Sequence, residues 1–439
     1  MSSRRMFLSS GITGLASISA TNVFAQNQRS SFIRTQPKDW PEISSTLEKV
    51  LLENILPFWY PKTLDKDFGG YQLNHDLYGV SKGSNNKRLV VQARCIWFYS
   101  RLVREGYGAE EHLEAARIGY EFMRDNLWDK QYGGFYWEVD TTGRVATMPE
   151  KHLYGEAFAL YALAEYAMAS SDPEPLAMAK KLFGLLEYHA YDLRFGGYIE
   201  SFHRDWTTPS VGQSYMSAPH DLKLMNTHLH LMEAFTTYFE ASRDHVARER
   251  LLELIMIMSN TVLRKKIGAC TDRYHRNWSS VRGAQYERVS YGHDIENVWL
   301  LMDACKATGM PDGPLMDFYT MLYSYSLQYG YDVKNGGFYA SGPFNGNADN
   351  RNKDWWVQAE GLVSALRMYQ RTGEDIYYNC FRQTLDWITK RQVDWEKGEW
   401  FGVAHESSAP TGDKAGPWKS PYHNGRAMME CMRIVKDYI

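Results

Sequence analysis

A glycine-rich phrase recurs six times along the chain, and this repeat restricts the fold more than any other feature. Successive first glycines are separated by 64, 63, 72, 68 and 62 residues. Each interval holds two stretches with apolar residues at helical spacing. Six helix pairs joined by such turns predict an all-α fold, an (α/α)6 barrel of twelve helices with short Gly-aromatic β-hairpin loops. The copies begin at Gly69, Gly133, Gly196, Gly268, Gly336 and Gly398, of which the fourth is weak.

The apolar spacing also sets approximate bounds for the helices. A hairpin is expected at 135–143, and the longest loop, about 202–222, is large enough to cover part of a cleft. No linker or low-complexity segment divides residues 26–439, so we expect one catalytic barrel domain there. The predicted helices span roughly 40–59, 88–105, 111–127, 153–169, 174–189, 223–242, 246–264, 293–308, 313–329, 354–371, 374–391 and 423–438.

The first 25 residues have the features of an export signal. Residues 3–8 read Ser-Arg-Arg-Met-Phe-Leu, which resembles a twin-arginine signal, and small residues at Val23 and Ala25 suit cleavage. The apolar stretch between them is too short and too rich in Gly, Ser and Thr for a membrane span. We therefore expect a periplasmic or secreted protein without a membrane anchor. An ordinary secretory signal with a chance arginine pair is the alternative.

Composition narrows the range of partners. Without residues 1–25 the chain keeps 47 basic and 52 acidic residues, a net charge of −5, which gives no electrostatic case for nucleic acid. Its five cysteines are scattered without a C-x-x-C pair, so neither a metal cluster nor a disulfide framework is expected. Aromatic residues make up 14% of the chain. They fill a core or line a cleft, and aromatic rings suit the C–H faces of sugars.

The unusual polar residues occur at one place in the repeat, the first turn of the second helix of each pair. If those helices form the inner ring, the six turns meet at one mouth. Polar residues that only cover a solvated face would instead be scattered, so the clustering indicates a site. The six segments are 92–94, 154–156, 226–230, 292–296, 355–360 and 418–424.

Three histidines in these segments suggest proton transfer near neutral pH. Asn226 and His230 are four residues apart and share a helix face, whereas His228 points elsewhere, so we favour His230 as the inward residue. His293 and Glu296 also share a face, and a carboxylate beside an imidazole would raise the basicity of the imidazole. His423 lies at the start of the last helix. Structural histidines and helix caps are the alternatives at each position.

The other candidates allow two interpretations each. Arg94 lies among apolar residues, where a salt bridge to Glu156 or Glu360 competes with a contact to substrate oxygens. Trp356 and Trp418 could stack on sugar rings, while core packing is the default for any single tryptophan.

At these motifs the chain resembles the N-acylglucosamine 2-epimerase superfamily, and within it the cellobiose 2-epimerases. The similarity covers essentially the whole chain after the export segment, although that segment is unusual for the family. Residues 225–230 (Met-Asn-Thr-His-Leu-His) have the cellobiose-epimerase form. The other matching motifs are 290–296, 355–360 and 418–427.

The resemblance implies inversion at C2 of the reducing-end sugar of a β-1,4-linked disaccharide, without a metal or another cofactor. The ring would open, C2 would lose a proton to give a cis-enediol, and a proton would return to the opposite face. By resemblance His293 and His423 form the acid/base pair, and His230 and Arg94 stabilise developing negative charge. Glu296 assists ring opening. The implied substrate contacts are Asn226, Trp356, Trp418, Tyr154 and Glu360.

Several alternatives remain open on the sequence. Aldose–ketose isomerisation shares the enediol intermediate, and mannobiose or lactose could replace cellobiose. A glycoside hydrolase would need two carboxylates beside the scissile oxygen, with Glu156 and Glu360 as candidates. That interpretation leaves the three histidines unexplained. A noncatalytic sugar-binding or protein-binding barrel predicts no loss of function when His293 or His423 is replaced by alanine. The chain is expected to be a monomer or a homodimer.

Overall fold

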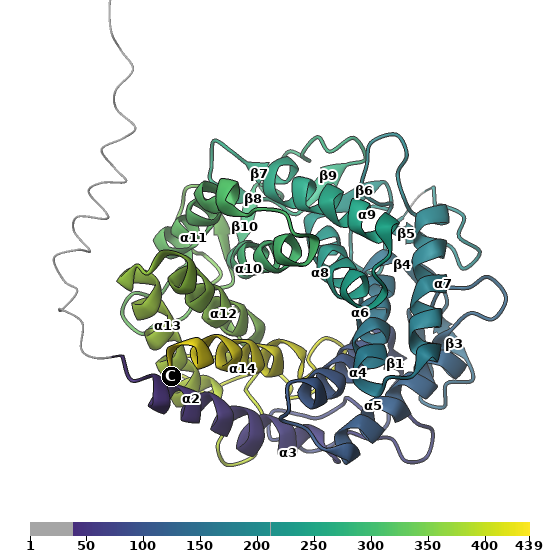
Figure 1. Cartoon of the computed structure of the whole chain (residues 1–439), viewed down its shortest axis with the longest axis horizontal. Coiled ribbons are helices and arrows are strands. Elements are labelled where there is room, and N and C mark those ends of the chain that lie inside the picture. Colours follow the sequence, from purple (N-terminus) through teal and green to yellow (C-terminus); the bar gives the residue numbers. More distant parts are fainter. Residues whose placement is uncertain (1–37, 211) are drawn as a thin grey trace, which may run out of the picture.

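Two concentric rings of helices make up the computed structural model, which describes residues 38–210 and 212–439 (Figure 1). Each inner helix packs against the next, and α14 packs against α4, so the ring closes between the two ends of the described chain. The predicted (α/α)6 barrel is confirmed. The inner helices are α4 (Leu89–Arg104), α6 (Leu153–Ser170), α8 (Met225–Ser242), α10 (Tyr291–Thr308), α12 (Trp355–Thr372) and α14 (Tyr422–Val435).

The outer helices cover the inner ring, and four of them end in a π-helical turn. The outer set is α2 (Trp40–Lys49), α5 (Glu110–Phe122), α7 (Pro173–His189), α9 (His245–Met256), α11 (Met316–Gly330) and α13 (Asp375–Trp387). The π-helical turns are η1 (Val50–Ile55), η2 (Met123–Leu127), η3 (Ile257–Thr261) and η5 (Ile388–Gln392), and α3 (Leu56–Trp59) follows η1. Short 3-10 turns are η4 (Gly313–Leu315) and η6 (Lys436–Tyr438).

Short antiparallel strands in the connecting loops all lie at one end of the barrel, next to the first turns of the inner helices. The paired strands are β1 (Lys87–Arg88), β2 (Glu138–Val139) and β3 (Ala146–Met148); β4 (Lys151–His152) with β5 (Ser201–Phe202); β6 (Leu222–Leu224) with β9 (Arg273–His275); β7 (Leu263–Arg264) with β8 (Ala269–Cys270); β10 (Arg288–Ser290) with β11 (Ser341–Pro343); and β12 (Lys353–Asp354) with β13 (Val403–Ala404). The predicted hairpin at 135–143 corresponds to the β2–β3 pair, which extends to Met148.

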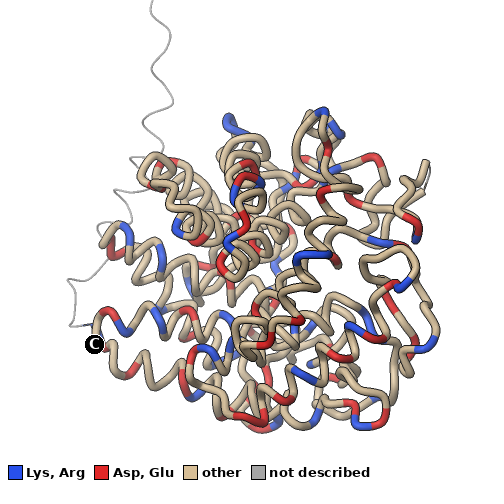
Figure 2. Tube along the Cα trace, turned by 45° about the vertical axis from the view of Figure 1, so that its right-hand side comes forward, with Lys and Arg blue, Asp and Glu red and all other residues tan. Residues whose placement is uncertain are grey.

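The outer surface carries both signs of charge. Figure 2 shows Lys and Arg interspersed with Asp and Glu over the described chain. Among the helices of residues 38–210 and 212–439, none is both long and apolar enough to cross a bilayer. The predicted export segment, residues 1–25, lies outside the described residues.

Five of the six glycine turns in the described chain have two successive residues with left-handed backbone. Gly69 and Gly70 have φ of 78° and 66°, values that side chains with a Cβ rarely adopt. An added Cβ at Gly70 would also lie 2.7 Å from Oε1 of Gln92 on α4. The second glycine is therefore needed both for its φ and for the close approach of the inner helix.

One residue in the first turn of each inner helix holds the adjacent Gly-aromatic turn, and we term these six the clamp residues. In the first five copies the clamp side chain accepts a hydrogen bond from a backbone N–H of the turn, at 2.8 to 3.1 Å. This N–H belongs to the residue two positions after the first glycine of the copy. In the sixth copy Glu399, with φ of 63°, replaces the second glycine, and the shorter clamp Asn424 donates to its carboxylate. The clamp residues are Gln92, Glu156, His228, Asp294, Gln358 and Asn424.

Buried Lys–Asp ion pairs stabilise five of the six turns. The aspartate precedes the first glycine by four residues, and the lysine comes from the following loop or strand. In the described chain the fourth copy, at Gly268, has no such pair, which agrees with its weak sequence match. The pairs are Lys87–Asp65, Lys151–Asp129, Lys223–Asp192, Lys353–Asp332 and Lys414–Asp394.

The clamp Asp294 makes a testable contribution to the pH dependence of stability. Burial raises the pKa of Asp294 to about 8, whereas an unfolded aspartate has a pKa of about 3.9. At a pH between these two pKa values, Asp294 is ionised in the unfolded chain and protonated in the folded chain. Stability therefore falls as pH rises from about 4 to about 8, by up to about 1.4 kcal/mol per pH unit.

An Asp294→Asn variant keeps an oxygen that can accept the N–H of Cys270 and does not titrate. We expect its free energy of unfolding, measured by urea denaturation at pH 5 and pH 8, to decline less than that of the wild type. Equal declines in the two proteins would show that Asp294 is already ionised in the fold.

Candidate active site

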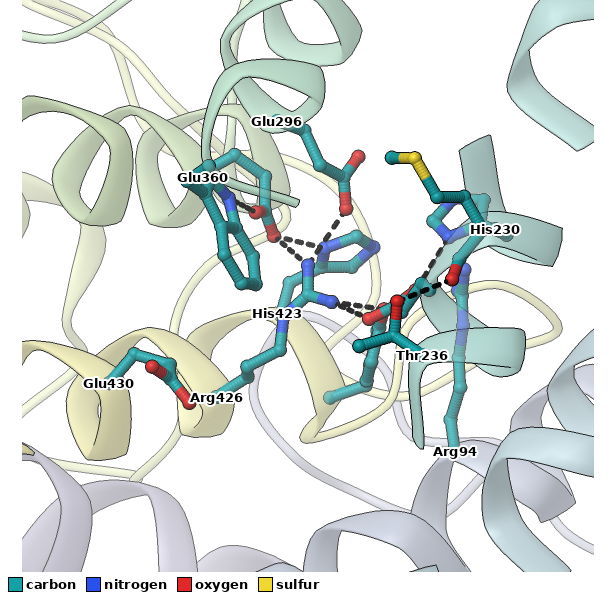
Figure 3. A network of polar contacts seen from close by, with 12 residues as sticks. Arg94, His230, Thr236, Glu296, Glu360, His423, Arg426 and Glu430 are labelled. Carbon is teal, nitrogen blue, oxygen red and sulfur yellow. Dashed lines mark hydrogen bonds and ion pairs between the residues drawn. The ribbon is translucent and has the colours of Figure 1, made fainter. Parts of the chain in front are cut away.

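Six side chains, one from each inner helix, meet at the centre of the barrel, and each follows a clamp residue by two positions. The Arg94 guanidinium lies 4.2 Å from the Phe158 ring centroid, which lies 4.9 Å from the His230 ring centroid. Figure 3 shows the polar members converging from different helices. The central residues are Arg94, Phe158, His230, Glu296, Glu360 and Arg426.

Arg426 is the hub of the central charges. Its guanidinium donates to Glu296 at 2.8 Å, to Glu360 at 2.7 Å, and to Glu233. Burial opposes ionisation of Glu233, but Arg426 and His230 outweigh it and lower the pKa of Glu233 to about 2. Burial and the neighbouring carboxylate of Glu360 raise the pKa of Glu296 well above its usual value. Glu233 is therefore the ionised partner of Arg426, and Glu296 is the carboxyl group of this cluster that holds a proton more readily.

Two of the three predicted histidines face a carboxylate through Nδ1. His230 Nδ1 lies 2.9 Å from Glu233 Oε2, and His423 Nδ1 lies 2.7 Å from Glu360 Oε1. Burial, and then the nearby arginines, lower the pKa of His423. Burial lowers the pKa of His230 although Glu233 opposes this. Both imidazoles are therefore neutral at neutral pH.

His293 differs from the expectation that Glu296 would lie beside it. In the described chain no hydrogen bond joins the two side chains, because Glu296 turns to the Arg426 guanidinium instead. The His293 ring packs 4.7 Å from Trp356, and Trp356 lies 5.7 Å from His423. Burial lowers the pKa of His293. His293 is thus a neutral imidazole that packs against Trp356 from α10, and His423 packs against the same ring from α14.

The other histidine of the His-x-His motif has a structural role. Nε2 of His228 accepts the backbone N–H of Tyr198, and Nδ1 donates to the carbonyl of Leu224. Glu156 is likewise a clamp residue, because it accepts the N–H of Phe135. Neither side chain is available to a substrate at the centre.

Arg94 is a buried cation without a carboxylate partner among the described residues. It is 3% exposed. Its Nη2 donates to Tyr154 Oη at 3.0 Å and its Nη1 to the Trp418 carbonyl at 3.2 Å, while Nε has no partner in the described part of the chain. The salt bridge to Glu156 or Glu360 that the sequence allowed is absent from this part of the chain. An unpaired buried guanidinium is costly, and it can stabilise negative charge on a ligand.

The remaining candidates surround the mouth of the site. Trp418 is 36% exposed, and its ring lies 6.2 Å from that of Tyr154. Trp356 is half-buried, and Oδ1 of Asn226 is buried without a partner among residues 38–210 and 212–439. Glu360 lies deeper, because His423 and Arg426 engage Oε1 and Trp299 donates to Oε2. Glu360 therefore supports His423 from behind.

Comparison with known proteins identifies the family of this chain. Residues 69–427 match the family model of N-acylglucosamine 2-epimerase (GlcNAc 2-epimerase). The chain belongs to this epimerase family. It is 30% identical over 400 residues to a cellobiose 2-epimerase of Bacteroides fragilis, covering 89% of this chain and 98% of that protein.

Solved structures of the family agree with the barrel. The cellobiose 2-epimerase structure from Bacillus thermoamylovorans B4167 superposes with a TM-score of 0.82 at 30% identity, covering 90% of this chain and 99% of that one. The structure from Spirochaeta thermophila DSM 6192 gives 0.81 at 32% identity, covering 92% and 100%.

Three residues of the charge network in this epimerase-family chain were given no role from the sequence. Glu233, Tyr422 and Arg426 lie within recognisable motifs, yet only the folded chain shows that they contact one another. The spacing of His230 and Glu233, three residues apart on one helix, could have found the first of them. Arg426 comes from a helix about 190 residues further along the chain, so no local pattern reveals its partners.

One group of central side chains in this family member has the composition of a metal site. Glu296, Glu360 and His423 each offer an atom within 4.8 Å of the others. Arg426, however, already donates to both carboxylates, and Nδ1 of His423 faces Glu360. The donor set is therefore engaged by a protein cation, and these residues do not fit a metal ion without displacing Arg426.

Proposed function

We propose that this protein is a sugar 2-epimerase that inverts C2 of the reducing-end sugar of a β-1,4-linked disaccharide. The observation that carries the proposal is the buried, unpaired Arg94 guanidinium beside neutral imidazoles. The names of the most similar relatives support the substrate class. C2 inversion needs a group that stabilises an oxyanion and bases that act on the two faces of a carbon, and the centre contains both kinds of group.

The reaction starts with opening of the hemiacetal ring, because the C2 proton becomes acidic only next to a free aldehyde. Glu296, whose pKa is raised by burial and by the carboxylate of Glu360, is the proposed acid for this step. Removal of the C2 proton then places negative charge on O1. Arg94 donates to this oxygen, and a single oxyanion donor of this kind is worth about 3–4 kcal/mol of barrier.

Two imidazoles then exchange protons with C2. His423, supported by Glu360, and His293 both pack against Trp356 and belong to different helices. One neutral imidazole accepts the O1 proton as Glu296 protonates the ring oxygen, and it thereby becomes the acid. The other neutral imidazole removes the C2 proton, and the first then returns its proton to the opposite face of C2. Inversion at C2 follows because one imidazole takes the proton from one face of C2 and the other imidazole delivers a proton to the opposite face.

We place the second sugar near the exposed Trp418. A recess of about 240 Å³ opens beside the first turn of α4, with Arg88 and Pro417 in its lining. The Arg88 guanidinium lies 5.6 Å from the Trp418 ring, so the recess adjoins the exposed tryptophan. Stacking on Trp418 suits the non-reducing sugar of a disaccharide.

Proton NMR of cellobiose in D2O with the purified protein tests the proposal. We expect glucosyl-mannose with deuterium at C2, and a fall in rate of at least about 100-fold in His293→Ala and in His423→Ala. Deuterium at C1 of a ketose would assign an aldose–ketose isomerase instead, and release of glucose a hydrolase. No reaction with cellobiose, lactose or mannobiose would contradict the disaccharide proposal and favour a sugar-binding barrel.

The geometry favours the epimerase over the hydrolase. Glycoside hydrolysis needs one free acid and one free carboxylate on either side of the scissile bond. Glu156 is a clamp residue, and Glu233, Glu296 and Glu360 all contact Arg426. None of these four is arranged as an independent carboxylate pair.

A further inference from the structure

Glu233 lies directly behind His230, on the side away from the mouth. The two residues belong to the same turn of α8 and are joined by the 2.9 Å contact between Nδ1 and Oε2. Glu233 is 4% exposed, and its other oxygen accepts from Arg426 and from the hydroxyl of Tyr422. Every polar contact of this carboxylate is thus made to a buried donor.

We propose that Glu233 is a positioning residue that fixes His230 as the Nδ1–H tautomer, so that Nε2 accepts a hydrogen bond from a substrate hydroxyl. This inference rests on the proposed function for the identity of the substrate. It assigns His230 a role different from the one that the sequence suggested, in which His230 and Arg94 both stabilise negative charge.

The tautomer follows from the contacts of the carboxylate. An ionised carboxylate only accepts hydrogen bonds, so Nδ1 of His230 must carry the hydrogen in their short contact. Arg426 and Tyr422 both donate to Oε1, which keeps the carboxylate ionised and its orientation fixed. In a neutral imidazole the other nitrogen, Nε2, then has a lone pair and no hydrogen.

The positive charges around His230 favour this neutral form. Arg94 and Arg426 both disfavour a proton on the imidazole. The enediolate of the proposed reaction has one oxyanion and one hydroxyl on adjacent carbons. Arg94 can donate to the oxyanion while Nε2 of His230 accepts from the hydroxyl, so the two residues hold the two oxygens in complementary ways.

The test compares Glu233→Gln with wild type by nitrogen-15 NMR of the imidazoles and by the pH profile of kcat/KM. A glutamine side chain has one accepting oxygen, and its amide nitrogen only donates. It therefore cannot accept hydrogen bonds from Tyr422 and Arg426 on one side and from His230 on the other. The NMR signals of His230 are assigned by their absence from a His230→Asn variant. We expect them to show the Nδ1–H pattern in the wild type and to lose this pattern in Glu233→Gln.

We expect kcat/KM of Glu233→Gln to fall about 100-fold or more, the order seen when a carboxylate that fixes a catalytic tautomer is made neutral. Because Glu233 raises the pKa of His230, the acidic limb of the profile should move to lower pH.

Glu430→Gln is the matched control. Glu430 is 4% exposed, is ion-paired with Arg101, Arg367 and Arg433, and lines the same cavity of about 220 Å³ as Glu233. It contacts no histidine in the described chain. We expect Glu430→Gln to lower the melting temperature comparably while leaving the tautomer of His230 and the pH profile unchanged.

Either of two results would overturn the inference. One is an Nε2–H or doubly protonated His230 in the wild type, and the other is a Glu233→Gln variant with the wild-type tautomer and pH profile. If Glu233→Gln does not fold, Glu233→Asp keeps the charge beside Arg426 but shortens the side chain away from Nδ1 of His230, and we expect a partial loss of the Nδ1–H pattern. The NMR test needs no substrate, so a failure of the epimerase proposal would leave this result readable.

Discussion

An Arg426→Met variant is expected to lose about 3–5 kcal/mol of its free energy of unfolding, as when one partner of a buried ion pair is removed. Arg426 is 2% exposed and is the shared counterion of three buried carboxylates. Methionine fills part of the volume without replacing the charge. Urea denaturation at pH 7 measures the loss, and the epimerase activity is expected to disappear with it.

The loss should depend on pH in a defined direction. Without Arg426 the three carboxylates have folded pKa values above that of an unfolded glutamate, about 4.3. Stability is then regained at pH below about 4 and lost as pH rises. Arg117→Met is the control, because Arg117 pairs with Glu114 and Glu121 on the exposed face of α5. Exposed pairs contribute about 0–1 kcal/mol. Equal losses in the two variants would contradict the assignment of Arg426 as the hub.

Arg94→Met is expected to show the opposite balance, with stability kept or increased and kcat/KM reduced about 10²–10³-fold. The unpaired guanidinium of Arg94 destabilises the free protein, since it is buried without a counterion, so its removal relieves a cost. The same guanidinium is the proposed donor to the O1 oxyanion, which accounts for the rate. Melting temperature and kcat/KM on cellobiose, measured on one preparation, check both parts.

Arg94→Lys separates charge from geometry. Lysine keeps the positive charge but cannot make the two simultaneous contacts to Tyr154 and the Trp418 carbonyl, so we expect an intermediate rate. An Arg94→Met variant that unfolds as readily as Arg426→Met would show that Arg94 is a structural residue. A variant with unchanged kcat/KM would remove Arg94 from the mechanism.

The period of the glycine turns was sufficient to predict the barrel, because a repeated helix pair has few ways to bury its apolar face. The bounds of some helices could not be predicted in the same way. The apolar pattern of 246–264 continues through one helix, yet α9 ends at Met256 and is followed by η3 and the strand β7. The apolar residues beyond Met256 keep their burial in a π-helical turn, so the pattern does not report the change.

The candidate site shows a similar limit. The sequence placed polar residues at the correct turns but could not separate clamp residues from central ones, since Gln92 and Arg94 differ only in which neighbour each contacts. The prediction that Glu296 lies beside His293 was wrong because Arg426, 130 residues further along the chain, competes for the carboxylate. Local spacing predicts which side chains share a face, and long-range charge pairs decide which of them interact.

The separation of clamp and central residues has a consequence for the evolution of this barrel. Each turn is held by a residue two positions before the one that faces the centre, so the reacting groups can be exchanged while the scaffold keeps its own contacts. Phe158 is the one apolar member of the central six and carries no part of the ion network. New acids or bases are therefore expected to arise at this position first, in natural relatives and in directed evolution, because the substitution breaks no existing charge pair.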